Sequence, residues 1–205
     1  MKQIPRWAVA SAASAPAILV GGWSLAARRQ PPEYDPIRDT ISALAGHGAS
    51  KRWVMTSALA GLGACHVVTA VGLRPAGMAG RVVLAGGGVA TLFVAGLPLP
   101  DEGSSRAHAI AAGASFLALG AWPMFAVRRA TLNPALRLDA SVMASGVLLG
   151  FVAWFVSELR GSRCGLAERV AAGAQALWPL VVVTAAKGAA APTSTRHRGM
   201  RYLCP

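Results

Sequence analysis

Five ionisable side chains of this 205-residue sequence are predicted to lie at a similar depth, where together they could perform acid–base chemistry or bind a metal ion. They are the carboxylates of Asp39, Asp101 and Glu158, the imidazole of His108 and the guanidinium of Arg106. A carboxylate beside a histidine can hold a divalent metal ion or move a proton on a substrate. None of the acids lies three or four positions from His108, so these side chains meet only if separate segments pack together. Solvated, charge-paired loops are the simpler interpretation.

His108 lies at the predicted start of a helix. Ser104 or Ser105 can cap the N-terminus of this helix, which puts His108 in its first turn, near the positive end of the helix dipole. An imidazole in that position can act as a base or as a metal ligand. The alternative interpretation is an interfacial histidine beside a helix cap.

A second histidine, His66, lies about thirteen residues inside an apolar stretch. At 1.5 Å per residue this is roughly 20 Å deep in a bilayer, where ionisable side chains are costly unless paired or functional. Two interpretations remain open: a neutral histidine bonded to a backbone carbonyl or a hydroxyl of a neighbouring helix, and a proton relay or ligand site. His66 and His108 differ by roughly 18 Å in predicted depth, which argues against a haem held by both.

Sequence signatures of common enzymes are missing. The three glycines at 86–88 lack the lysine of a phosphate-binding loop, and neither GxSxG nor HExxH occurs. The sequence therefore leaves open whether the protein is an enzyme. A secondary transporter usually carries charged residues at the midplane or broken helices in matched halves, and the interiors of the predicted spans hold only His66.

The elements that position these residues are predicted from hydropathy. Hydrophobic residues make up 54% of the chain and charged residues 14%, against about 45–50% and about 25% in soluble proteins. Six stretches reach the roughly 20 residues that cross a bilayer. They are 7–27, 53–73, 82–99, 107–127, 140–158 and 168–186. The sequence predicts an all-α polytopic membrane helix bundle with six transmembrane helices and both termini on one side. The bundle forms a single domain over 1–187, and 188–205 form a disordered basic tail.

Small residues within the spans predict close packing of the helices. Close backbone approach, by which transmembrane helices associate, is allowed by Gly61 and Gly63, by the three glycines at 86–88 and by the Gly146/Gly150 pair. The longest connection, 28–52, contains a short predicted helix that Asp39 or Thr40 can cap and Gly46 can end; Ile41, Leu44 and Ala45 share one of its faces. This helix lies on the membrane surface or closes over the bundle.

Charge separates the two ends of the predicted bundle. The net charge is +12, and its basic residues stand between apolar blocks and in the tail, which indicates anionic lipid head groups and excludes nucleic acid as a partner. Lys and Arg are slightly more numerous on the side of the termini, which favours cytoplasmic termini. All acids except Asp139 fall on the opposite side. Function should therefore be sought first at this mixed-charge end.

Two motifs carry a resemblance to a known family. The segment 34–48, YDPIRDTISALAGHG, and the segment 96–108, GLPLPDEGSSRAH, resemble the bacterial membrane-protein family catalogued as domain of unknown function 998. The resemblance covers roughly residues 8–187 and implies a six-helix fold without an established activity. Carried over by position, the residues that it marks all fall at the mixed-charge end. They are Asp39, Ser42, Gly46, Ser105 and His108.

The leading functional hypothesis is a multi-pass protein of the bacterial plasma membrane, with cytoplasmic N and C termini, that binds a lipid or a membrane partner through an outward-facing polar site. The predicted binding residues are Asp39, Ser42, Ser105, Arg106 and His108. The alternative is an integral-membrane hydrolase or transferase acting on a lipid or envelope substrate, with His108 as base and Asp39 or Glu158 as partner. A small-molecule transporter ranks third.

Membrane lipids are the expected partners, together with a second copy of the chain or another membrane protein. No cofactor is predicted. The only metal that the carboxylates and His108 could hold is a divalent ion. The sequence does not assign ligands to it.

Overall fold

The computed structural model describes residues 3–101, 103–129 and 131–188, and all regular structure in this part of the chain is helical. The elements are α1 (Arg6–Ala27), α2 (Ile41–Leu44), α3 (Trp53–Gly72), α4 (Met78–Gly96), α5 (Arg106–Phe125), η1 (Pro134–Leu136), α6 (Leu138–Ser157) and α7 (Cys164–Gly188). Six of them match the predicted spans, although α4 and α7 each begin four residues before the predicted 82 and 168. The predicted tail, 188–205, lies outside the described residues except for residue 188, which ends α7.

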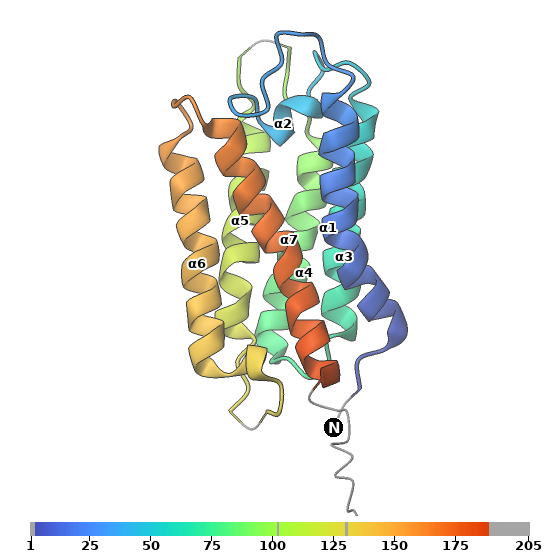
Figure 1. The fold of residues 1–205 in the computed structure, drawn as a ribbon, viewed down its shortest axis with the longest axis vertical. Helices are drawn as coiled ribbons and strands as arrows, with labels where there is room; N and C mark the ends of the chain where they lie inside the picture. The colour runs from blue at the N-terminus through green and yellow to red at the C-terminus, as the bar shows by residue number, and fades with distance from the viewer. Residues whose placement is uncertain (1–2, 102, 130, 189–205) are drawn as a thin grey trace, which may run out of the picture.

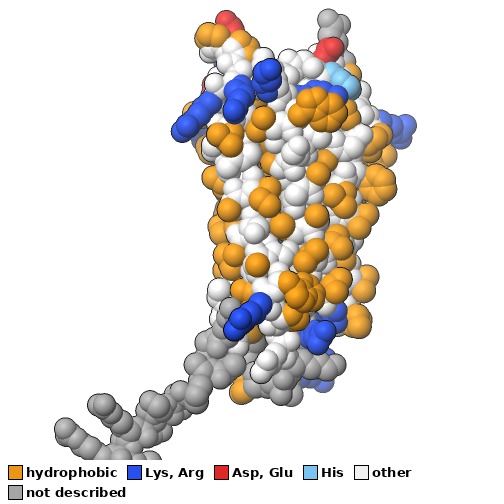
Figure 2. All heavy atoms as spheres, turned by 90° about the vertical axis from the view of Figure 1, so that its right-hand side faces the viewer, with side chains coloured by type: hydrophobic (Ala, Val, Ile, Leu, Met, Phe, Trp, Pro, Cys, Tyr) orange, Lys and Arg blue, Asp and Glu red, His pale blue; other side chains and the backbone are white. Residues whose placement is uncertain are grey.

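The six long helices have the length and surface of membrane-crossing segments. Each has at least 19 residues and is apolar enough to span a bilayer. The outer faces of the helices carry exposed large hydrophobic side chains such as Phe93, Ile110 and Leu117, which are 59%, 65% and 59% exposed. Figure 2 shows hydrophobic side chains down the side of the molecule and charged ones toward its two ends. The chain is therefore an all-α polytopic membrane bundle, as predicted.

The helices form a closed ring. Successive long helices pack against each other, and α7 closes the ring by packing against both α6 and α1. α1 begins and α7 ends at the same end of the bundle, while α2 lies across the opposite end (Figure 1). We call this opposite end, with the connections 28–52, 97–105 and 158–163, the α2 end. It corresponds to the predicted mixed-charge end.

Glycines permit close approach at some of the predicted positions and not at others. A Cβ atom on Gly63 of α3 would lie 2.6 Å from the Gly88 carbonyl oxygen, and one on Gly88 of α4 would lie 2.7 Å from that of Gly63. These two helices therefore pack through a paired glycine contact. Gly146 and Gly150 are exposed on the outer face of α6, and a Cβ added to either would have no atom of another element within 4 Å, so they play no part in this packing.

The short helix α2 closes over the bundle, one of the two predicted alternatives. Thr40 caps it: the Thr40 Oγ1 accepts a hydrogen bond of 3.0 Å from the Ala43 N–H. Ile41 and Leu44 are 2% and 1% exposed and pack into an apolar cluster with Leu19 of α1. α2 is therefore the roof of the bundle core.

Candidate functional site

The loop before α2 is fastened to α7 by one arginine. The Nη1 of Arg169 donates hydrogen bonds of 2.8 Å to the carbonyl oxygens of Pro36, Asp39 and Gly165. Its Nη2 donates to the Tyr34 hydroxyl. Burial raises the pKa of Tyr34, and the charge and hydrogen bond of Arg169 oppose that shift. Arg169 thus organises the loop that leads to α2.

The first turn of α7 completes this attachment. The Gly165 N–H donates to the Arg38 carbonyl oxygen at 3.1 Å, and the Leu166 N–H donates to that of Ile37 at 2.9 Å. Amide groups at a helix N-terminus have no partner within the helix, and here loop carbonyls satisfy them. A Cβ on Gly165 would collide with the Asp39 carbonyl oxygen, so the contact requires glycine.

Glu168 connects α7 to the start of α2. Its side chain is buried, at 4% exposure, and accepts hydrogen bonds from the Ile41 N–H and, at 3.0 Å, from the Ser42 hydroxyl. Because α7 begins at Cys164, Glu168 lies one turn inside the membrane-spanning helix. The roof is therefore held from below by a buried carboxyl group.

A cavity of about 50 Å³ lies beneath this roof. That volume accommodates a few water-sized groups, since one water needs about 10–15 Å³ on this measure. Leu62 and Phe116 are among the apolar residues that line it. Its polar lining comes from Ser42, His66, Thr91, Ser115, Glu168 and Gln175.

Most of these polar groups have partners. The Thr91 and Ser115 hydroxyls lie 2.7 Å apart, and the Gln175 Nε2 donates to the Phe116 carbonyl oxygen at 2.8 Å. His66 is the exception: it is 1% exposed, and neither ring nitrogen has a hydrogen-bond partner among the described residues. The interpretation in which a carbonyl or a hydroxyl of a neighbouring helix satisfies His66 is therefore wrong. The cavity contains an unpaired imidazole.

Of the predicted binding residues, Ser42 lies in the cavity lining. Asp39 does not line it; its Oδ2 accepts a hydrogen bond of 2.8 Å from the Asp35 N–H, and its carbonyl oxygen is bound by Arg169. Gly46 follows α2 and donates from its N–H to the Ala43 carbonyl oxygen. These residues shape the roof and its loop.

Ser105 and His108 form a second group at the start of α5. Ser105 is the N-cap, as the sequence allowed, and its Oγ accepts a hydrogen bond of 3.2 Å from the His108 N–H. His108 is 5% exposed, and its Nδ1 lies 2.7 Å from the Leu97 carbonyl oxygen. Arg106, beside them, is exposed. His108 thus binds the connection between α4 and α5.

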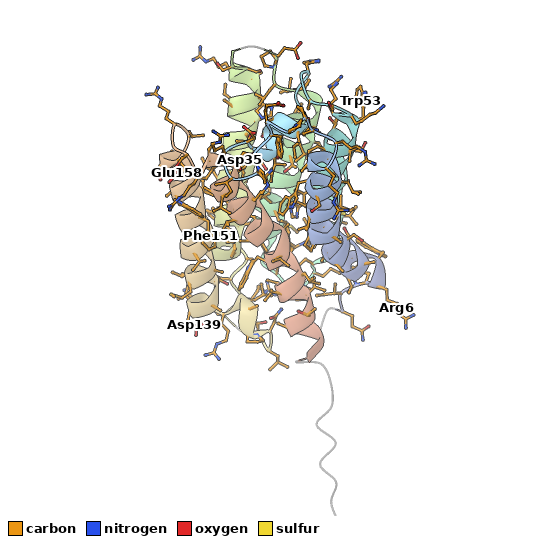
Figure 3. The ribbon with its side chains drawn as sticks, turned by 45° about the horizontal axis from the view of Figure 1, so that its top comes forward. Arg6, Asp35, Trp53, Asp139, Phe151 and Glu158 are labelled. Atoms are coloured by element: carbon orange, nitrogen blue, oxygen red, sulfur yellow. The ribbon has the colours of Figure 1, made fainter. Side chains whose placement is uncertain are left out.

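Glu158 belongs to a third group. Its Oε2 accepts a hydrogen bond of 3.2 Å from the Arg163 N–H within the turn between α6 and α7. Figure 3 shows Glu158 at the end of α6, apart from Asp35 in the first loop. Within the described ranges, no hydrogen bond or ion pair joins Asp39, His108 and Glu158. The same ranges contain no group of three His, Cys, Asp or Glu side chains placed to hold a metal.

Three polar residues of α7, Glu168, Arg169 and Gln175, were not among the site residues predicted from the sequence. The predicted span began at 168, which left the first two at the membrane surface, and the span interiors were expected to hold only His66. Glu168 lies inside the span from Cys164 to Ala186, which corrects that expectation. The sequence signal for an earlier start of this span was the run of apolar and small residues 164–167, Cys-Gly-Leu-Ala, directly before Glu168 and Arg169.

Comparison with known proteins identifies the family of the chain. The family model described as "Protein of unknown function (DUF998)" matches residues 9–185. The chain belongs to the DUF998 family. No curated protein and no solved structure matches it. The DUF998 match includes every residue that lines the cavity, together with the loop that Arg169 binds.

Proposed function

We propose that this DUF998 protein binds a lipid through its polar head group in the cavity beneath α2. The observation that carries the proposal is His66, a buried imidazole with two unpaired nitrogens in a polar cavity. A buried polar group without a partner costs about 1–3 kcal/mol. A bound polar group removes that cost.

The position of the cavity supports a lipid as the ligand. It lies among membrane-spanning helices, where lipid is the most concentrated polar ligand available. Its walls combine polar groups such as Glu168 and Gln175 with apolar ones such as Leu62 and Phe116. Such a lining suits an amphiphile better than a fully hydrated solute.

The geometry supports binding more than catalysis. The proposed enzyme required His108 to act with Asp39 or Glu158, and these side chains take part in three separate hydrogen-bond groups. We therefore place the functional centre at the cavity rather than at those three residues.

We further propose that the protein resides in the bacterial plasma membrane with its termini in the cytoplasm, which places the α2 end outside. The slight excess of Lys and Arg on the terminal side supports this orientation. The cavity would then take lipid from the outer leaflet.

Native mass spectrometry of the full chain in detergent tests the binding proposal. With phosphatidylethanolamine and phosphatidylglycerol added, the wild type should retain lipid, and His66→Leu and Gln175→Leu should lose it. Thr184→Val is the matched control, because Thr184 is exposed on α7 and bonds only to its own helix. Equal lipid retention by all four proteins would contradict the proposal.

A further inference from the structure

We infer that the polar group bound in this cavity is a primary ammonium group. The inference rests on the proposed function and names the chemistry of its ligand. It follows from the charge of the lining, from the acceptors that the lining offers and from the size of the cavity.

The lining attracts a cation. It contains one carboxyl group, Glu168, and neither lysine nor arginine. The nearest basic side chain in sequence, Arg169, is turned to the loop, where it binds the carbonyl oxygens of Pro36 and Asp39. A phosphate or carboxylate placed in the cavity would face a buried carboxyl group, and the lining offers no lysine or arginine to pair with the anion. A cation would gain from the same carboxyl group.

The lining also offers hydrogen-bond acceptors at several sites. A neutral His66 ring has one acceptor nitrogen, and it is unpaired. The Gln175 amide donates through Nε2, which leaves its Oε1 to accept. Each Glu168 oxygen receives one hydrogen bond from the roof and has capacity for another. An ammonium group brings three donors to these acceptors.

Size separates a primary ammonium from other cations. A cavity of about 50 Å³, which has room for a few water-sized groups, admits a primary ammonium group, because that group is close to water in size. A trimethylammonium group is much larger and has no N–H to donate. A divalent metal ion prefers several carboxylate, imidazole or thiolate ligands, and the part of the chain that the structure describes offers no cluster of three.

Two sources carry this chemistry: the ethanolamine head group of a phospholipid and a free amine. Native mass spectrometry can titrate the full chain in detergent with phosphatidylethanolamine, phosphatidylcholine and phosphatidylglycerol. We expect phosphatidylethanolamine to bind most tightly, and Glu168→Gln to weaken it by about tenfold to a hundredfold, the effect of losing one charge-assisted hydrogen bond. Glu168→Gln keeps an acceptor for α2, so the roof remains in place. His66→Leu is the second variant, and Thr184→Val is the control.

A parallel arm measures the Tm of lipid-free protein in methylammonium chloride, with tetramethylammonium chloride as the ionic control. A rise in Tm with methylammonium alone, lost in Glu168→Gln, supports the inference, and it assigns the free amine as source if none of the three phospholipids binds. Phosphatidylcholine or phosphatidylglycerol binding as tightly, with loss in His66→Leu, would overturn the ammonium inference while leaving the proposed function standing. Lipid binding that neither variant alters would overturn both.

Discussion

Two buried polar side chains of the bundle differ in how their hydrogen bonds are satisfied. Glu168 has partners on α2, so its burial stabilises the roof. His66 has none and lines the same cavity. Unpaired buried groups are uncommon in folded proteins because each destabilises the fold, and such a group therefore indicates a ligand or water site.

Replacing His66 separates stability from binding. In lipid-free detergent, His66→Leu should keep or raise the Tm, because it removes two unpaired nitrogens whose burial costs about 1–3 kcal/mol each. Differential scanning fluorimetry measures this. A clear fall in Tm would mean that His66 makes a stabilising interaction of its own, contrary to the structure.

Tyr34 reports on the loop above the cavity. Burial raises the pKa of its hydroxyl, with Arg169 opposing the shift, so tyrosinate should form with a midpoint above 10. The chain has two tyrosines, so the difference in ultraviolet absorbance between wild type and Tyr34→Phe isolates this group. Because the folded pKa exceeds the unfolded one, its stabilising contribution is complete below pH 10 and is lost as pH rises through the folded pKa. A midpoint at or below 10 would show that Arg169 dominates.

At the scale of elements, local signals predicted α2 but not its partner. Thr40 marks the start and Gly46 the end of a short segment with Ile41 and Leu44 on one face. This pattern involves only neighbouring residues, so the sequence alone predicts the helix. The contact between Ile41 and Glu168 joins residues 127 positions apart. Hydropathy does not reveal such a pairing.

The same limit explains the misplaced start of α7. Glu168 and Arg169 lower the local hydropathy, so the predicted span began at 168. Their polar groups are satisfied by the roof and its loop, which allows the helix to begin at Cys164. In a hydropathy profile, a charged pair inside a membrane span is mistaken for the end of the span unless the partners of its charges are known.

Two glycines of α7 test the attachment of the loop. Gly165→Ala should destabilise the protein by about 1–3 kcal/mol, since its Cβ would collide with the Asp39 carbonyl oxygen. Gly173→Ala is the matched control; its Cβ would lie 3.7 Å from Trp23, an ordinary contact, and alanine favours the helix by about 0.5–1 kcal/mol. Thermal unfolding in detergent compares the two. Equal stability of both variants would argue against the tight contact at Gly165.

At the scale of the whole molecule, the fold followed from composition. Long apolar stretches determine where helices cross a bilayer, and all six were found. The site was predicted in part: Ser42 lies in the cavity lining, whereas His66 was recognised without its surroundings. Which polar residues share a cavity depends on how six helices are rotated within the ring, and a single sequence does not specify those rotations.

Orientation in the membrane is tested by cysteine labelling. In a background without native cysteines, Ser50→Cys at the α2 end and Leu132→Cys in the connection between α5 and α6 place exposed thiols at opposite ends. A membrane-impermeant maleimide added to intact cells should label Ser50→Cys and spare Leu132→Cys. The reverse pattern would place the cavity at the cytoplasmic leaflet.

The central claim is that lipid occupies the cavity at His66. The most direct measurement is ¹⁵N NMR of the histidine rings in the full chain in detergent, titrated with equal parts of phosphatidylethanolamine and phosphatidylglycerol, with His66→Leu assigning the resonance. The His66 ring nitrogens should shift as lipid is added, while those of His108, already bonded to Leu97, should stay unchanged. His66 resonances that do not respond to lipid would contradict the claim.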